Sequence, residues 1–262
     1  MAIVLNLLRL LVISLSLMLQ CCQHHEVHDD STSTTKKDLS KAASFNMQLG
    51  LGYLKQGDRQ RAKKKLLTAL LQAPQAPDVN AAMAYYFEQS EELDDARRYY
   101  QNAVRLSSNS GSQLNNFGTF LCRQGEYKKA EIYFLKAVKD IQYVNTAGAY
   151  ENAGLCSLAI PDLDKAKIYF IQALKHDPSR RESLLELVKF NKKMGLNGDA
   201  LNQLQHYPEL VLMDEQLLLL AKELAFLEGN TQLSSEYSTL YTTIKLNNAN
   251  SGVNDEYDSH SG

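Results

Sequence analysis

Tryptophan is absent from the 262-residue chain, proline occurs only 5 times, and no Asn-Gly or Asp-Gly pair separates two alternating apolar runs. Without such a hairpin signal, the sequence gives no support to β-strands. Apolar residues make up 44% of the chain, and Tyr and Phe recur at helical spacings. The formal net charge is only −2, which argues against a general nucleic-acid surface. These absences leave an all-α protein that does not bind nucleic acid.

Motifs for catalysis are also missing. The chain has no Gly-rich phosphate loop, no G-x-S-x-G and no H-E-x-x-H, the patterns that supply phosphate-binding amides, a nucleophile or zinc ligands. The sequence therefore predicts no enzyme, no cofactor and no small-molecule substrate. His24, His25 and His28 lie in a polar stretch that offers no fixed geometry, so we expect no metal site there.

The clearest pattern is a pair of short helices joined by a tight turn. It covers Gln113–Val138 and reads QLNNFGTFLCRQGEYKKAEIYFLKAV. Gly118 and Ala130 are small enough for two helices to approach closely, while Phe134 fills the space between them. Gly125 suits the end of the first helix, where a left-handed backbone is easiest for glycine. This is the pattern of one tetratricopeptide (TPR) repeat.

The pattern recurs about every 34 residues. Four copies are clear, the fourth offset by two extra residues near Asn145. A fifth and a sixth are degenerate, as is usual for terminal repeats that expose one face to water. We therefore predict an all-α, right-handed TPR solenoid of about six helix-turn-helix repeats. The small and turn positions of the other copies are Gly50, Gly57 and Ala62; Ala84, Glu91 and Ala96; Gly154 and Ala166; Gly195 and Ala200; and Ala221 and Gly229.

The N-terminal segment is typical of an export signal. Residues 1–20 carry a single charge, and Leu10–Leu19 has the length of a signal-peptide apolar region, short for a membrane span. The segment ends at Cys21 and Cys22, which makes it a candidate lipoprotein signal. We predict lipid attachment at Cys22, with Cys21 as the alternative. A plain signal peptide or signal anchor with an incidental cysteine pair is the other interpretation.

Composition divides the chain into four segments. We expect a lipoprotein-type signal peptide over 1–21 and a flexible tether over 22–42, which is polar and rich in Ser and Thr. The TPR solenoid is expected over 43–246. A turn-forming, acidic stretch over 247–262 predicts a disordered tail.

Beyond the signal boundary, the chain has two cysteines, Cys122 and Cys156, which lie one repeat apart. They fall near the ends of the first helices of consecutive repeats, which lie side by side in a TPR stack. In an oxidising compartment such a pair forms a disulfide if the Cα atoms come within about 4.4 to 6.8 Å. Two separately buried thiols are the alternative. We predict the disulfide, which would lock the third repeat onto the fourth.

The first helices of a TPR stack line a concave groove. By their repeat positions, Met47, Leu51 and Leu54 of the first repeat and Tyr85 of the second face it. An apolar stripe with an adaptable Met and a Tyr suits an amphipathic helix or a short apolar peptide from a partner. The alternative is that residues before Ala43 cover this stripe as a cap.

The third-repeat segment LNNFGTFLCRQGEYKKAEIYFLKA, Leu114–Ala137, together with the lipoprotein-type signal, the tether and a second cysteine at Cys156, resembles the PilW/PilF family of type IV pilus biogenesis and stability lipoproteins. The run N-N-F-G-x-F-L-C, ending at Cys122, is much more specific than generic TPR spacing. The resemblance implies a pilotin, held by its lipid in the outer membrane of a Gram-negative bacterium and facing the periplasm. It implies that the partner is the secretin subunit, whose insertion and multimerisation the pilotin promotes.

A different class of function shares the same anchor and fold. A general envelope scaffold or adaptor lipoprotein, for example one that binds peptidoglycan enzymes, would also have a lipidated TPR solenoid. Recovery of hydrolases instead of a secretin in a pull-down would favour this alternative.

Overall fold

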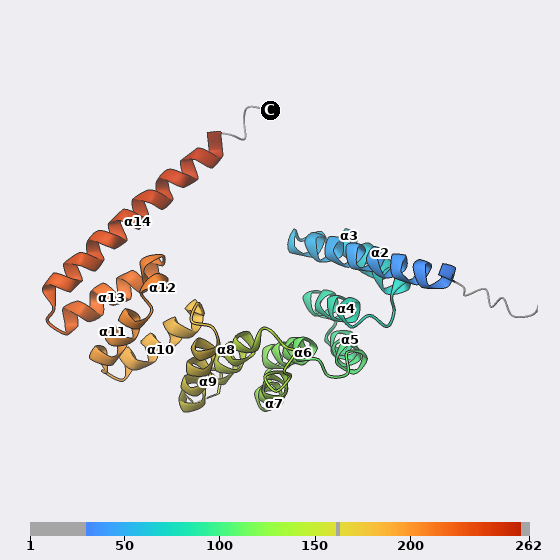
Figure 1. Ribbon diagram of the computed structural model, residues 1–262, viewed down its shortest axis with the longest axis horizontal. Helices are drawn as coiled ribbons and strands as arrows, with labels where there is room; N and C mark the ends of the chain where they lie inside the picture. The colour runs from blue at the N-terminus through green and yellow to red at the C-terminus, as the bar shows by residue number, and fades with distance from the viewer. Residues whose placement is uncertain (1–29, 161–162, 258–262) are drawn as a thin grey trace, which may run out of the picture.

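This computed structural model describes residues 30–160 and 163–257, and within these ranges every regular element is an α-helix. The helices form consecutive antiparallel pairs, as the sequence predicts (Figure 1). The first four pairs are α2 (Asp30–Lys55) with α3 (Arg59–Gln72), α4 (Pro77–Gln89) with α5 (Leu93–Leu106), α6 (Gly111–Arg123) with α7 (Tyr127–Ala137), and α8 (Thr146–Ser157) with α9 (Leu163–His176). The later helices are α10 (Arg181–Lys193) with α11 (Asn197–His206), the short α12 (Pro208–Leu212), and α13 (Glu215–Leu227) with α14 (Thr231–Tyr257).

The turn inside the pairs repeats one backbone conformation. Gly57, Gly125, Gly195 and Gly229 have φ between +75° and +80°, and Glu91 has φ +62° at the corresponding place in the second pair. Positions 57, 91 and 125 follow at intervals of 34, as do 195 and 229, whereas 125 and 195 are 70 apart, which is two periods plus two residues. The two extra residues predicted in the fourth repeat are therefore present in the structure.

Close packing within the pairs depends on a small residue in the first helix and a large one in the second. At each small position an added Cβ would lie less than 3 Å from the facing side chain, so a larger residue has no room. The contacts recur at corresponding places in three repeats: Gly50 against Leu66, Gly118 against Phe134, and Gly154 against Phe170.

Buried clusters follow one another along the stack. One cluster joins the first two pairs around Leu66 and Met83, the next runs from Ala84 to Tyr169 with Phe117 and Phe134, and a third holds Leu184, Leu204 and Leu217. Each cluster is built from neighbouring pairs, as expected for a solenoid in which every repeat contacts only the next. The predicted all-α solenoid of helix pairs is thus confirmed.

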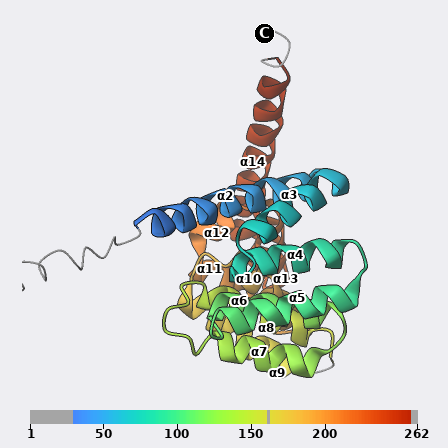
Figure 2. The ribbon, with the colours of Figure 1, turned by 90° about the vertical axis from the view of Figure 1, so that its right-hand side faces the viewer.

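The stack is curved, with α2 and α3 at one end and α13 and α14 at the other (Figure 1). In the view turned by 90°, the turns inside the pairs α4–α5 and α6–α7 lie on one side of the solenoid (Figure 2). The connections between pairs lie on the opposite side, and α2 also begins there (Figure 2). Within the described ranges, no helix combines the length and the apolar character that crossing a membrane requires.

The ends of the solenoid differ from the segment limits that the sequence suggested. The first helix begins at Asp30, so residues 30–42 of the predicted tether continue α2. The last helix runs to Tyr257, well into the range 247–262 predicted as a disordered tail. Propagation explains both differences, because a helix already held by packing gains one backbone hydrogen bond for each residue added. Residues 1–29 and 258–262 lie outside the described residues.

Candidate partner-binding groove

The concave side of the first four repeats holds a cavity of about 720 Å³. Its walls come from the first helices of those repeats, α2, α4, α6 and α8, with Tyr100 added from α5. Because these helices lie side by side, residues about one repeat apart in the sequence become neighbours along the cavity. We call this cavity the groove.

One end of the groove is apolar. Met47 and Leu51 of α2 face Ala81 and Tyr85 of α4 across it, and all four are at least partly accessible to solvent. Partly exposed Met and Tyr side chains provide large contact areas, and the thioether of Met adapts to the shape of a partner. This end can bury an apolar side chain from a bound protein segment.

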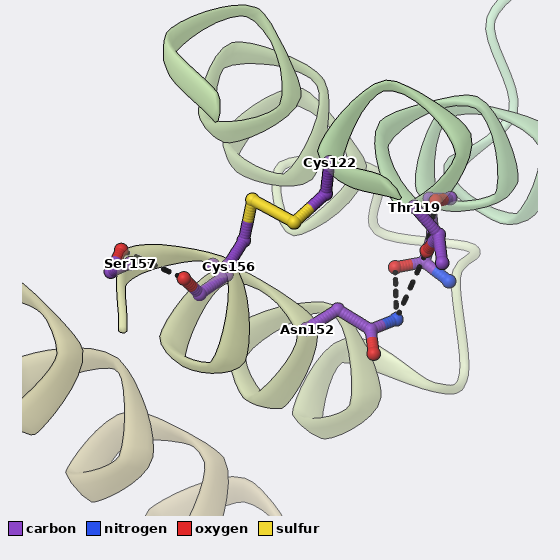
Figure 3. The surroundings of a disulfide bond; sticks show 7 residues. Thr119, Cys122, Asn152, Cys156 and Ser157 are labelled. Atoms are coloured by element: carbon purple, nitrogen blue, oxygen red, sulfur yellow. Dashed lines mark hydrogen bonds between the residues drawn. A yellow bond between two sulfur atoms is a disulfide. The ribbon is translucent and has the colours of Figure 1, made fainter. Parts of the chain in front are cut away.

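The other end of the groove is lined with the side-chain amides of Asn115 and Asn152, which we call the amide wall. The Nδ2 of Asn152 donates hydrogen bonds to the Oδ1 of Asn115, at 3.0 Å, and to the Oγ1 of Thr119, at 3.4 Å (Figure 3). The Oδ1 of Asn152 and the Nδ2 of Asn115 have no partner among the described residues, so one acceptor and one donor remain at the groove. An amide offers the same two functions as a peptide group. This wall can therefore pair with the main chain of a bound segment without a charged ligand.

A buried carboxylate links the second and third repeats under the groove. Arg123 of α6 donates from Nε to Oε1 of Glu88 in α4, at 2.5 Å, and from Nη2 to Oε2, at 2.8 Å. Tyr100 donates its hydroxyl to the same Oε2 at 3.0 Å. Bidentate pairing fixes the plane of the guanidinium, and 47% of the Arg123 side chain remains exposed at the groove.

The network around Glu88 also shifts protonation equilibria. The hydrogen bond to Glu88 raises the pKa of Arg123. Burial raises the pKa of the Tyr100 phenol, and the Glu88 carboxylate raises it further. Both groups therefore keep their protons at any physiological pH.

A second contact across the same two repeats lies further toward the start of the first helices. The buried Gln113 of α6 donates from Nε2 to the Oδ1 of Asp78 in α4, at 2.7 Å. Both residues line the groove. Together with the Glu88 network, this bond holds α4 and α6 at two points along their length.

The structure joins Cys122 of α6 and Cys156 of α8 in a disulfide (Figure 3). Their Cα atoms are 5.8 Å apart, within the range that this bond requires. The sequence predicts the same pair. The bond lies near the ends of the two helices and next to the amide wall, so it holds the third and fourth repeats together beside the groove.

Of the four residues that the sequence assigns to the groove, three line it and one is buried in the core. Met47, Leu51 and Tyr85 line it. Leu54 does not; its side chain is only 8% exposed and packs in the core with Leu66 and other residues of the first two repeats. Three residues along an α-helix turn a side chain by about 300°, and in α2 this rotation directs Leu54 away from Leu51 and into the core. The assignment of Leu54 to the groove was wrong.

The cap expected as an alternative is also not formed by the described residues. Residues 30–42 continue α2 in line with Met47 and Leu51, so they do not fold back over the apolar end. The sequence missed Arg123 and Asn152 as groove residues. Both stand in helices assigned to the groove, but their direction depends on how neighbouring repeats are rotated.

Other predicted sites lie outside the described residues. Cys21 and Cys22, the candidates for lipid attachment, precede α2, as do His24, His25 and His28. Within the described ranges, no group of His, Cys, Asp or Glu side chains is placed to hold a metal ion.

The chain is similar in sequence and structure to a known protein. No protein-family model matches the chain. The type IV pilus assembly protein PilF of Pseudomonas aeruginosa is 34% identical over 159 residues, which cover 61% of this chain and 63% of PilF. The solved structure of Pseudomonas aeruginosa PilF superposes with a TM-score of 0.65 and 28% identity, over 80% of this chain and 99% of that one. The chain is thus a TPR protein similar to PilF.

A further PilF/PilW-like structure agrees. The crystal structure of PilW, a widely conserved type IV pilus biogenesis factor, matches with a TM-score of 0.60 and 26% identity, over 75% of this chain and 90% of PilW. The resemblance carried by Leu114–Ala137 is thus confirmed, as is the TPR solenoid. The sequence match spans less than two thirds of PilF.

Proposed function

We propose that this PilF/PilW-like protein is an outer-membrane TPR lipoprotein that acts as a pilotin in type IV pilus biogenesis. It binds secretin subunits in the groove and promotes their insertion into the outer membrane and their multimerisation. Its role is binding, not catalysis. The lipid is attached at Cys22, with Cys21 as the alternative, and the solenoid faces the periplasm.

The groove is the observation that carries this proposal. It combines an apolar end, an amide wall and a fixed guanidinium in one cavity of about 720 Å³, large enough for several side chains of a protein segment. Apolar anchors supply most of the affinity of such a contact, and polar groups set its register. The similarity to PilF and PilW, which are named for pilus assembly and pilus biogenesis, supports a secretin segment as the occupant.

A crosslinked pull-down of the native protein from cell envelopes tests the proposal. Mass spectrometry identifies both the partners and the protein's own N-terminal peptide. We expect a secretin among the partners and an acylated Cys22 or Cys21. Hydrolases without a secretin would instead support the envelope scaffold. An unprocessed Met1 peptide would contradict the lipid anchor.

The groove itself is tested by replacing its apolar end. We expect Leu51→Ala combined with Tyr85→Ala to weaken secretin binding about tenfold or more, because both truncations remove buried contact area. Circular dichroism should show unchanged helicity, since both side chains are partly exposed. Leu71→Ala is the matched control, because Leu71 is exposed on α3 and outside the groove. Equal binding by the double variant and the control would exclude this end as the site.

A further inference from the structure

The connection between α7 and α8 exposes two large apolar side chains completely. Ile141 is 99% exposed and Val144 is 100% exposed. Among the other described residues, no large apolar side chain exceeds the 85% of Met213. The two residues lie three positions apart in one short loop and project away from the solenoid, so they form an apolar tip that no contact within the protein explains.

The loop around this tip is held in place. The Asp140 carboxylate accepts hydrogen bonds from the backbone N–H of Gly111, at 2.6 Å, and of Gln142, at 3.0 Å. Tyr143 packs closely on Gly111. A Cβ added at Gly111 would lie 2.5 Å from the Cβ of Tyr143. The loop therefore partly buries Tyr143 and presents the neighbouring Ile141 and Val144 outward as a fixed feature. A preformed tip loses little conformational freedom on binding.

Two lysines precede the tip. Lys136 and Lys139 lie with Asp140 along a shallow depression beside it. No ion pair joins either lysine to another described residue, and Asp140 is occupied by two backbone N–H groups. Lys136 lies over the ring of Tyr133, 5.5 Å from its centroid, and keeps its charge. Apolar side chains flanked by lysines without a carboxylate partner are the combination that proteins use at the surface of an anionic bilayer.

The position of the loop supplies the second argument. The α7–α8 connection and the beginning of α2 lie on the same side of the solenoid (Figure 2). If Cys22 carries a lipid, the stretch from Cys22 to Asp30 spans at most about 28 Å even when fully extended. The bilayer must then lie close to this side of the molecule.

We propose that the α7–α8 loop is a second membrane contact, in which Ile141 and Val144 enter the interface of a lipid bilayer while Lys136 and Lys139 lie against anionic headgroups. This inference uses the proposed lipid anchor but not the proposed secretin partner. A convex apolar tip suits a lipid surface, which deforms around it, better than a protein, which needs a matching pocket. With two contacts, the lipid and the loop, the orientation of the groove relative to the membrane is fixed.

The absence of tryptophan from the chain makes a direct test possible. Single tryptophans are introduced by Ile141→Trp and, as the matched control, by Met194→Trp in the full-length protein. Met194 is 61% exposed in the turn between α10 and α11, outside the α7–α8 loop. Both exposed positions tolerate the change without disturbing the core. Each variant is reconstituted into vesicles of phosphatidylethanolamine and phosphatidylglycerol, with and without brominated acyl chains.

For Ile141→Trp we expect emission at shorter wavelength in vesicles and quenching by the brominated lipids. Met194→Trp should show neither effect. Unchanged emission from Ile141→Trp, or equal quenching of both variants, would overturn the proposal. If the emission wavelength of Ile141→Trp is unchanged by vesicles but becomes shorter when envelope proteins are added, the proposal would be overturned in favour of a protein partner. Recovery of the protein with the vesicles reports the lipid anchor separately, so a failed anchor is distinguishable from a failed loop contact.

Discussion

At the scale of single residues, Gly50 and Gly52 of α2 show how differently two glycines in one helix are used. A Cβ added at Gly50 would lie 2.6 Å from the Leu66 side chain and 3.3 Å from the carbonyl oxygen of Ala62. At Gly52 nothing lies within 4 Å of an added Cβ. Gly50 lets α3 approach α2, whereas Gly52 faces open space.

Alanine at the two positions should therefore have opposite effects. We expect Gly50→Ala to lower the free energy of unfolding by about 1 to 3 kcal/mol, because Leu66 must shift. Gly52→Ala should raise it by up to about 1 kcal/mol, because alanine favours the helix. Urea unfolding followed by circular dichroism measures both, and each variant is the control for the other. Effects of the same sign would contradict this account.

At the scale of elements, the turn of the second pair uses a residue that is poorly suited to it. Glu91 adopts φ +62°, and the N–H of Glu92 then donates to the carbonyl of Phe87 at 2.9 Å. The corresponding turns at Gly57 and Gly125 make the same closing bond from the next residue. A left-handed conformation costs a non-glycine residue about 1 to 2 kcal/mol.

We expect Glu91→Gly to be neutral or to raise the free energy of unfolding by up to about 1 kcal/mol, since the strain relieved exceeds the added freedom of the unfolded chain. The reverse exchange, Gly125→Ala, should lower it by about 1 kcal/mol or more. Chemical denaturation of both variants at one pH tests this. Destabilisation by Glu91→Gly would mean that the Glu91 side chain contributes more than the turn geometry shows.

The beginning of α13 has a pH-dependent cap. Desolvation opposes ionisation of Asp214, but hydrogen bonds from Arg181 and from the N–H of Leu217 outweigh it and hold the pKa of Asp214 below 3.8. A carboxyl group with a lowered folded pKa stabilises the protein above its unfolded pKa, and the contribution is lost as pH falls through the folded value. The stabilisation is therefore present at neutral pH and disappears in acid.

We expect the free energy of unfolding to fall as the pH drops below about 4. Asp214→Asn keeps a side chain that can cap the helix but removes the charge. This variant should be less stable than the native protein at pH 7, and the difference should shrink as the pH falls below about 4. Urea unfolding across this pH range gives the two curves, and parallel curves would exclude a role for the Asp214 charge.

At the scale of the whole molecule, the disulfide is a covalent link in a stack otherwise held together by contacts between neighbours. A solenoid tolerates local opening at any junction between repeats. The bond between Cys122 and Cys156 closes one of these junctions beside the groove. It should therefore stabilise the part of the stack on which the amide wall depends.

We expect Cys122→Ser to lower the free energy of unfolding by about 3 to 4 kcal/mol, the chain-entropy value for a loop of this length. The α-helical content should remain. A reducing agent should have the same effect on the native protein and none on the variant. Equal stability of the oxidised and reduced native protein would show that the bond does not restrain the unfolded chain.

Several features of the molecule were predictable from the sequence because they repeat with the chain. The turn positions, the small residues facing large ones and the cysteine pair one repeat apart depend on local helix geometry and on the 34-residue period. These are properties of one repeat and its neighbour. The resemblance at Leu114–Ala137 added the family, since its residue run is more specific than TPR spacing.

Tertiary structure alone decided which residues line the groove. Leu51 and Leu54 look equivalent in the sequence, yet one lines the groove and the other is buried in the core. Arg123 donates a hydrogen bond to the carboxylate of Glu88, 35 residues earlier in the chain. Asn152 donates one to Asn115, 37 residues earlier. Such pairings depend on how far each repeat is rotated against the next. That rotation results from side-chain packing between repeats, which the period of the sequence does not specify.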